Sequence, residues 1–272
     1  MLFLKNIRLR KKTWLGKSQQ ENRCADLADL VVKHFSREQI ILTTYFTGKR
    51  DPQRGGGNQY KPDKYENMKG WYDSLIAHHL NGIIFHDQLS KDFIDRYTND
   101  HVHFEEYKLK KVYSLNDDRF FCWCEWLEQH EEAEAVFCTD LFDVDFLGNP
   151  FSLMDPPKYD LYCGDDGGAE INDYVKTRMR WAYGKAFHVD KIKFNAGTIG
   201  GTRENVLRLF QNMIHDFEHA KRAKRKRQNV NMGVFNKCVH DLFDESRIMY
   251  GSPLNSRFKQ YEKEGNFCIR HK

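Results

Sequence analysis

Residues 134–151 read EAVFCTDLFDVDFLGNPF, and this stretch sets the fold that the sequence predicts. Residues 136–138 form an apolar run typical of a short buried strand. Residues 139–145 would then lie at the C-terminal end of this strand, where open α/β sheets bind their ligands. This segment contains three carboxylates, Asp140, Asp143 and Asp145.

Carboxylates gathered at one point need a positive charge beside them. Mg²⁺ and Mn²⁺ take oxygen ligands, and one or two side-chain carboxylates commonly hold them together with substrate phosphates and water. The cluster therefore predicts a divalent-cation site that binds a nucleotide diphosphate. The alternative is a solvated junction between a strand and a loop, because Asp is an ordinary turn residue.

Composition indicates a folded globular protein. The 272 residues are 40% hydrophobic and 14% aromatic, enough for a sizeable core. We find no run of about 18 apolar residues, and the start MLFLKNIRLRKK has the wrong order for a signal peptide, so we expect a cytoplasmic protein. The seven scattered cysteines predict buried free thiols rather than disulfides or a zinc site. The net charge of +4 fits phosphate-bearing ligands without demanding nucleic acid.

Strand and helix patterns alternate along the chain. Apolar runs predict strands at 40–46, 82–86 and 102–107, and helical spacing predicts helices at 20–36, 65–80, 92–97 and 116–130. This order is typical of an α/β fold with a Rossmann-like, mostly parallel central sheet flanked by helices. We expect Asn116 or Asp117 to cap the last of these helices, and the sheet to be complete by residue 147. With no internal repeat or linker in view, we expect a helical extension at 1–37 and a single domain at 38–272.

The second half of the chain adds further polar segments. Residues 194–210, FNAGTIGGTRENVLRLF, contain small residues that let the backbone approach a ligand closely, and then predict a helix from Arg203. The alternative is a tight turn that packs this helix onto the sheet, and the glycine spacing differs from the dinucleotide fingerprint. Residues 163–174, CGDDGGAEINDY, predict a flexible acidic loop. Its candidates for a general base are Asp166, Glu170 and Asp173, with solvated loop charges as the alternative. Residues 267–269 predict a last strand that carries His271 and Lys272 at its end.

Taken in order, these segments resemble a known family. TTYFTGKRDPQRG, NDDRFF, TDLFDVDFLGNPF, FNAGTIGG, NVNMGVFN and PLNSRFKQYE, with a final HK, are similar to the GT-A glycosyltransferases, which use nucleotide sugars. Within that family the chain most resembles the small glycosyltransferases of large algal (chlorella) viruses, over about residues 38–272. The resemblance implies a GT-A catalytic domain, Mn²⁺ or Mg²⁺, a UDP-linked sugar donor and a hydroxyl of a glycan or glycoprotein acceptor. For a viral protein it implies the host cytoplasm.

The resemblance also implies roles for single residues. The metal ligands would be Asp140, Asp143 and His271. Asp145 is held in reserve, because the spacing of the first two aspartates is D-x-x-D and the literal D-x-D is Asp143 with Asp145. The nucleotide would be bound by Thr43, Thr44, Tyr45, Phe46, Arg54, Arg119, Asp140 and Lys272, with Lys272 opposing the diphosphate charge. The donor sugar would meet Asn195, Gly197 and Asn231. The alternatives are an ion-paired Arg119 and a solvated chain end at residues 271–272.

The implied chemistry is stabilisation of a departing nucleotide diphosphate. A bound cation acts as a Lewis acid on the leaving group. An inverting enzyme also needs a carboxylate to deprotonate the acceptor, for which Asp166 and Glu170 are the first candidates, whereas a retaining enzyme does not. Both remain open. We expect the loops at 47–62 and 163–174 to close over the donor.

Two other functions compete with this prediction. The run KRAKRKR at 221–227 is typical of nucleic-acid or anionic-membrane binding, so a metal-dependent nuclease or a nucleic-acid-binding protein is the main alternative. Because the run lacks interleaved aromatic residues, we expect no stable nucleic-acid partner, and peripheral membrane contact stays open. A sugar-binding module without turnover is the third possibility.

Overall fold

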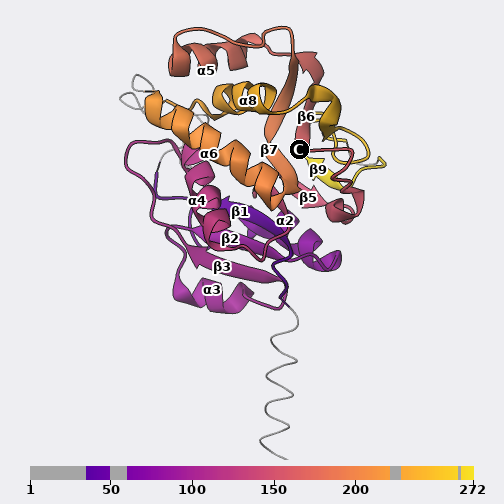
Figure 1. The fold of residues 1–272 in the computed structure, drawn as a ribbon. Helices are drawn as coiled ribbons and strands as arrows, with labels where there is room; N and C mark the ends of the chain where they lie inside the picture. The colour runs from indigo at the N-terminus through magenta and orange to yellow at the C-terminus, as the bar shows by residue number, and fades with distance from the viewer. Residues whose placement is uncertain (1–34, 50–59, 221–227, 263–264) are drawn as a thin grey trace, which may run out of the picture. The chain divides into compact units, whose positions relative to one another are not determined.

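The computed structural model describes residues 35–49, 60–220, 228–262 and 265–272. Residues Arg37–Lys272 form one compact unit, which contains all of the elements named below (Figure 1). Several sequence predictions lie outside the described residues. They are the extension and helix up to residue 34, most of the closing loop at 47–62 with Arg54, and the basic run at 221–227.

Strands and helices alternate through most of this unit. The strands are β1 (Gln39–Tyr45), β2 (Gly82–His86), β3 (Val102–Glu106), β4 (Ala135–Thr139), β5 (Val144–Phe146), β6 (Leu161–Glu170), β7 (Ile192–Thr202), β8 (Ile248–Tyr250) and β9 (Ile269–His271). The α-helices are α2 (Tyr65–Ala77), α3 (Lys91–Tyr97), α4 (Leu115–Gln129), α5 (Asp173–Tyr183), α6 (Arg203–His219) and α8 (Asn231–Leu242). Two short 3₁₀ helices are η1 (Pro150–Leu153) and η2 (Glu245–Arg247).

The central sheet has seven strands in the order β3-β2-β1-β4-β7-β6-β8. Strands β1 to β4 pair in parallel, β7 is antiparallel to both β4 and β6, and β8 is parallel to β6. Within this sheet, β7 is therefore antiparallel in direction to the other six strands. This confirms the predicted α/β fold with a mostly parallel central sheet, and it is compatible with a Rossmann-like GT-A fold. A separate pair, β5 with β9, is antiparallel.

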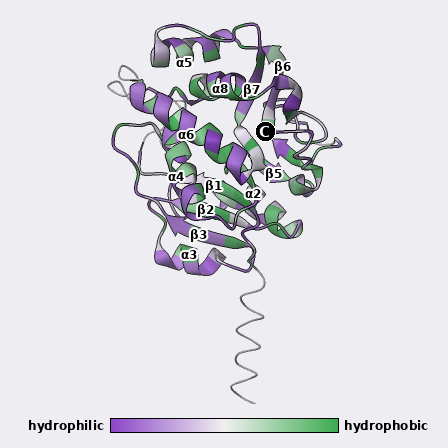
Figure 2. Ribbon diagram, viewed as in Figure 1, coloured by the Kyte–Doolittle hydropathy of each residue, from purple (hydrophilic) through white to green (hydrophobic). Residues whose placement is uncertain are grey.

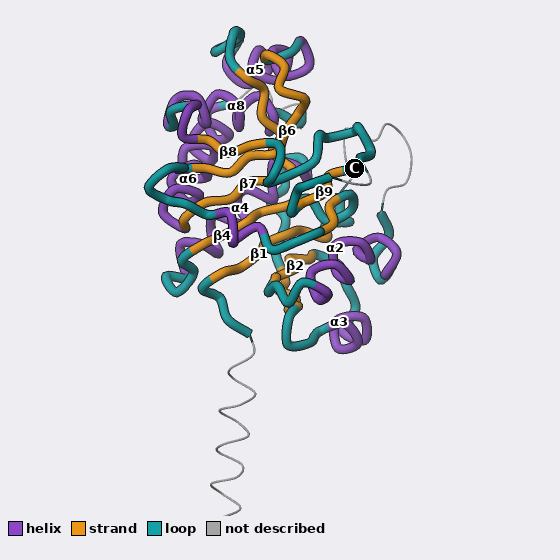
Figure 3. Tube along the Cα trace, turned by 90° about the vertical axis from the view of Figure 1, so that its right-hand side faces the viewer, coloured by secondary structure: helices purple, strands orange, loops and turns teal. Residues whose placement is uncertain are grey.

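Helices cover both faces of the sheet (Figure 3). On one side, Trp71 of α2 is fully buried in a cluster with Ile41 and Tyr45 of β1. On the other side α4 packs on α6, where the rings of Trp123 and Phe210 stack at 5.9 Å. The buried residues of α6 recur every three or four positions, as expected for a helix with one apolar stripe, and both hydrophilic and hydrophobic residues are visible on it in Figure 2.

The prediction that the sheet is complete by residue 147 was wrong, because β6, β7 and β8 extend it. Residues 163–170 form most of β6 rather than a flexible loop, and residues 194–202 belong to β7 rather than to a turn. The small residues of β7 allow close packing: a Cβ on Gly200 would lie 2.2 Å from the Phe137 ring. The helix predicted from Arg203 is confirmed as α6.

Three smaller predictions have mixed outcomes. The cap of α4 is Ser114, whose Oγ accepts a hydrogen bond from the backbone N–H of Asp117 at 3.2 Å, so the predicted cap at Asn116 or Asp117 was wrong. The last strand covers Ile269–His271, two residues later than predicted. The six cysteines in the described part of the chain are free, and five of them are buried, as predicted. Within the same residues, no helix has the length and apolarity needed to span a membrane.

Candidate metal and nucleotide site

The candidate site forms where β4 ends and the chain turns into β5. Asp140 directly follows β4, and Asp143 directly precedes β5. The antiparallel register of β5 and β9 places Val144 opposite His271, and the backbone N–H of Lys272 donates to the Asp143 carbonyl at 2.9 Å. Strand pairing thus carries His271 to two aspartates that are distant from it in sequence.

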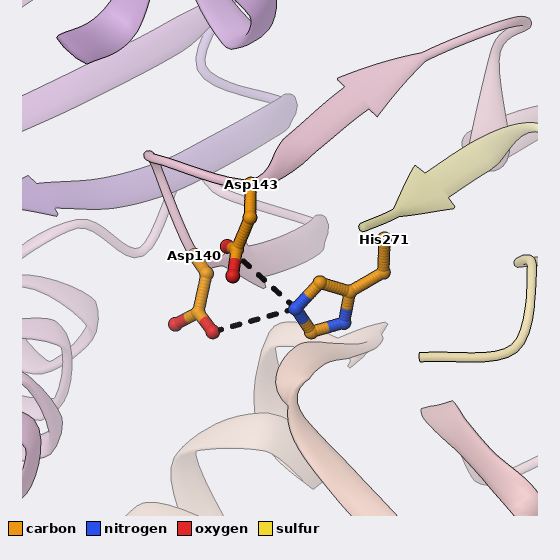
Figure 4. A group of neighbouring side chains, drawn as sticks. All are labelled: Asp140, Asp143 and His271. Atoms are coloured by element: carbon orange, nitrogen blue, oxygen red, sulfur yellow. Dashed lines mark ion pairs between the residues drawn. The ribbon is translucent and has the colours of Figure 1, made fainter. Parts of the chain in front are cut away.

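The three side chains converge on one point (Figure 4). His271 Nε2 lies 3.6 Å from Asp140 Oδ2 and 3.7 Å from Asp143 Oδ1, and one ligand atom from each residue falls within 4.8 Å of the others. These separations exceed hydrogen-bond lengths and suit ligands arranged around a shared cation.

His271 provides the test of whether a cation fits. Its side chain is buried, at 2% exposed, yet neither Nδ1 nor Nε2 has a hydrogen-bond partner among the described residues. Buried polar atoms are nearly always satisfied, so an imidazole that faces two carboxylates beyond hydrogen-bond distance fits a cation bound by all three side chains. Two carboxylate oxygens with an imidazole nitrogen form a donor set that suits Mn²⁺, and less well Mg²⁺. Asp140, Asp143 and His271 therefore fit the divalent cation that the sequence predicts.

Gly197 of β7 lies directly beside this cluster. A Cβ at this position would come 2.2 Å from His271 Cε1 and 2.6 Å from Asp140 Oδ2. The backbone of Gly197 also accepts a hydrogen bond from the N–H of Asp140 at 2.9 Å. The absence of a side chain here therefore lets β7 approach the ligands closely and fix one of them.

Arg119 of α4 holds Asp140 from the other side. Its guanidinium forms an ion pair with the Asp140 carboxylate and donates to the Ala196 carbonyl at 3.1 Å. Burial raises the pKa of Asp140, but the charge of Arg119 and the neighbouring His271 outweigh burial and lower that pKa to about 2. The carboxylate is thus kept ionised, as a metal ligand must be. The sequence left two roles open for Arg119, a nucleotide contact and an ion pair. The structure shows the ion pair with Asp140, and the nucleotide contact stays a prediction.

Asp145 lies outside the cluster. It is 5% exposed and forms ion pairs with Arg270 and with Lys272, whose Nζ lies 2.7 Å from it. Residues two apart in a strand share a face, but β5 begins at Val144 and does not include Asp143. Asp143 and Asp145 can therefore point to different places. The reserve assignment of Asp145 as a metal ligand is not supported by this arrangement. The ammonium group of Lys272 is paired with Asp145, and its predicted role against a diphosphate stays a prediction.

A cavity of about 680 Å³ opens beside Asp140 and Asp143. Nine of the residues predicted from the sequence line it: Thr44, Phe46, Arg119, Asp140, Asp143, Asp166, Asn195, Gly197 and Asn231. Asn195 is held in place because its Oδ1 accepts the Gly197 N–H at 2.7 Å. Asn231 begins α8, and its backbone N–H donates to Asp117 Oδ1 at 2.8 Å.

Two residues predicted for the nucleotide lie elsewhere. Thr43 and Tyr45 are fully buried, on the face of β1 opposite to Thr44. Thr43 donates to the Thr139 carbonyl at 2.8 Å, and the Tyr45 hydroxyl donates to the Lys61 carbonyl at 2.9 Å. Strand alternation therefore separates a structural pair, Thr43 and Tyr45, from Thr44 and Phe46, which line the cavity.

The three candidates for a general base also separate. Asp166 lines the cavity, and Lys193 Nζ lies 3.3 Å from it. Glu170 and Asp173 are exposed and are not lining residues, so the geometry favours Asp166 among the three candidates, and the assignment of Glu170 stays a prediction. The sequence predicted a flexible loop at 163–174 that could bring Glu170 to the ligand. In the structure β6 continues to Glu170 instead, and this residue lies outside the cavity lining.

Sequence reasoning missed several lining residues: Tyr60, Phe142, Arg178, Lys193, Phe258 and Lys259. Lys193 could have been found from its spacing, because it alternates with Asn195 and Gly197 once β7 is recognised as a strand. Phe142 lies between the two aspartates and stacks on Tyr60 at 3.4 Å. The Phe258 ring lies 4.4 Å from that of His271, in the segment PLNSRFKQYE, to which no role was given.

No protein-family model matches this chain, and a search of curated proteins finds no match to its sequence. The assignment of the site therefore depends on the chain's own residues.

Proposed function

We propose that this chain is a metal-dependent glycosyltransferase that moves a sugar from a nucleotide diphosphate sugar, with UDP as the nucleotide, to a hydroxyl of a glycan or glycoprotein acceptor. One observation carries the proposal: a buried imidazole without hydrogen-bond partners faces two carboxylates at the C-terminal end of β4, beside a large cavity. The site also lies at the carboxyl ends of β1 and β4, on whose two sides the strand order runs in opposite directions, the usual place for a ligand in an open α/β sheet. A cytoplasmic location is part of the proposal.

Asp140, Asp143 and His271 would hold Mn²⁺ or Mg²⁺. When bound, the cation supplies Lewis-acid stabilisation to the departing diphosphate. Lys259 lines the same cavity and stands on the Phe258 ring at 5.0 Å, next to His271. It therefore replaces Lys272 in our proposal as the side chain that opposes the diphosphate charge.

The remaining lining residues would position donor and acceptor. Thr44 and Phe46 at the end of β1, with Tyr60 and Phe142, present the aromatic and hydroxyl surface that a nucleoside needs. The Oδ1 of Asn195 is occupied by the Gly197 N–H, which leaves its amide Nδ2 to donate to a sugar hydroxyl. In an inverting reaction Asp166 would accept the acceptor proton; in a retaining reaction no such base is needed.

A melting scan tests this function. The purified protein is melted with UDP, GDP, CMP or ADP, each with and without Mn²⁺. We expect UDP to raise the melting temperature only when Mn²⁺ is present, because binding to the folded state stabilises it. Asp143→Ala and His271→Ala should abolish the shift, whereas Asp173→Ala, at an exposed position outside the cavity, should retain it. If no nucleotide shifts the wild-type protein, the transferase proposal fails.

A further inference from the structure

Arg178 lines the cavity but has no role in the chemistry proposed above. It belongs to α5, and it lines the cavity together with Met232 of α8. The two helices touch through Gly233, where a Cβ would come 2.6 Å from the Met179 backbone nitrogen and 2.9 Å from Arg178 Cβ. This close helix contact fixes the backbone that carries Arg178.

The guanidinium of Arg178 is held by aromatic rings rather than by an acid. Its Cζ lies 3.8 Å from the centre of the Tyr174 ring and 4.6 Å from that of Trp181, both on the same helix. Within the described part of the chain, no carboxylate lies within ion-pair distance of Arg178, and its buried Nε has no hydrogen-bond partner. A guanidinium stacked in this way keeps its in-plane N–H donors for a ligand.

Two other charged residues of the cavity lining, Lys193 and Asp166, neutralise each other. Lys193 is 8% exposed and is paired with Asp166 at 3.3 Å, so the two contribute little net charge. Arg178 is therefore left as an unbalanced cation. A planar guanidinium donates two parallel hydrogen bonds to a carboxylate, sulfate or phosphate, and a neutral hydroxyl does not match that geometry.

Arg178 is connected to a part of β7 other than the one that carries Gly197. Its helix α5 packs on Gly233 of α8, and Asn236, on the next turn of α8, accepts from the Phe194 N–H at 2.9 Å. Gly197 instead lies beside Asp140 and His271. We therefore assign the diphosphate to the Gly197 end of the cavity and Arg178 to another group of the substrate.

We infer that Arg178 binds an anionic substituent, a carboxylate, sulfate or phosphate, carried by a substrate of this site. This inference rests on the proposed function, because it assigns the nucleotide diphosphate to the other end of the cavity. The anionic group belongs either to the acceptor glycan or to the sugar that is transferred.

The experiment measures binding of matched neutral and acidic ligands to the full chain. The acceptor arm uses fluorescent disaccharides that differ only in glucose against glucuronate, or in galactose against 6-sulfogalactose, with UDP and Mn²⁺ present. The donor arm compares UDP-glucose with UDP-glucuronate in the presence of Mn²⁺. Each ligand is titrated against the wild type, Arg178→Gln and Arg178→Lys. The matched control is Arg180→Gln, the same change at an exposed position of the same helix that does not line the cavity.

We expect the wild type to prefer the acidic member of a pair in one arm, and Arg178→Gln to weaken that binding by roughly 10- to 100-fold. Arg178→Lys should retain part of the preference because it keeps the charge, and Arg180→Gln should retain all of it. The arm in which the preference appears identifies the substrate that carries the anion.

Equal binding of neutral and acidic ligands by the wild type would overturn the inference. So would equal effects of Arg178→Gln and Arg180→Gln, or tighter binding of a single-stranded RNA oligonucleotide that also depends on Arg178. If UDP still stabilises the protein with Mn²⁺ while no acidic preference appears, this inference fails and the proposed function stands. If the acidic preference appears without metal-dependent UDP binding, the proposed function fails and the anion site stands.

Discussion

Gly197 is the single residue that most directly controls the packing of the candidate metal site. In Gly197→Ala the new Cβ would overlap both His271 and Asp140, so these ligands must move apart. We expect Mn²⁺ affinity, measured by titration calorimetry, to fall at least about tenfold, because ligand geometry is displaced. The control is Gly148→Ala, whose Cβ would make an ordinary contact of 3.4 Å with Cys268 Sγ. Equal Mn²⁺ affinity in the two variants would show that β7 does not shape the site.

Asp145 supports the site from behind, although it is not a ligand. It is buried and accepts from Arg270 and Lys272, the two residues that flank His271. We expect Asp145→Asn to lower the free energy of unfolding by about 2 kcal/mol. This is less than the cost of breaking a fully buried ion pair, because Arg270 and Lys272 are partly exposed. Urea unfolding measures this change. Asp95→Asn, which removes an exposed ion pair with Lys91 on α3, should leave the free energy of unfolding almost unchanged, and an equally small effect of Asp145→Asn would contradict the assigned role.

At the scale of elements, Asp117 connects two helices. It lies in α4, and its Oδ1 accepts the backbone N–H groups of Val230 and Asn231 at the start of α8. Burial raises the pKa of Asp117 from 3.8 to about 7, although hydrogen bonds from Ser114 and from these two N–H groups oppose the rise. Deprotonation of this carboxyl is therefore more costly in the folded protein than in the unfolded chain.

The pH dependence follows from that difference. Between about pH 4 and pH 7 the folded state holds a proton on Asp117 that the unfolded chain has lost, so the contribution of Asp117 to stability falls as pH rises through this range. Asp117→Asn cannot titrate. We expect its stability to equal that of the wild type near pH 4 and to exceed it at pH 8, by up to roughly 4 kcal/mol. Urea unfolding at both pH values measures the difference, and a variant that is less stable at pH 8 would refute this account.

The elements also show where sequence reasoning succeeds. Strands β1 and β2 and helix α2 were predicted because their apolar residues repeat locally with the strand or helix period. Strands β6 and β7 were missed because their glycines and aspartates are typical of turns. Distant partners stabilise them instead: buried Asn255 accepts from the Asp165 N–H at 3.0 Å, and buried Asn236 accepts from the Phe194 N–H at 2.9 Å. No local pattern reports such long-range bonds.

For the whole Arg37–Lys272 unit, the candidate site was predicted in part. The resemblance of ordered segments named Asp140, Asp143 and His271, which the fold brings together through the pairing of β5 with β9. It did not show that Thr44 lines the cavity and Thr43 does not, because that depends on strand alternation. Nor did it show that Lys259 lines the cavity while Lys272 pairs with Asp145, because that depends on contacts in three dimensions.

The cavity draws its lining from both halves of the sheet, which sets a prediction for the whole unit. Thr44 comes from the parallel half, and Lys193 and Asn195 come from the reversed strand β7. The cation would be held by Asp140 and Asp143, which follow β4, and by His271 of β9, so a nucleotide bound with its cation should restrain these two segments together. We therefore expect hydrogen exchange, followed by mass spectrometry, to slow at residues 140–146 and 269–272 when UDP and Mn²⁺ are added together, while α3, which contributes no lining residue, exchanges unchanged. Asp143→Ala should remove the protection at both segments. Protection limited to one segment would mean that the ligand does not join β4 and β9 through a shared cation, and equal protection at α3 would mean that binding stabilises the unit globally rather than at this site.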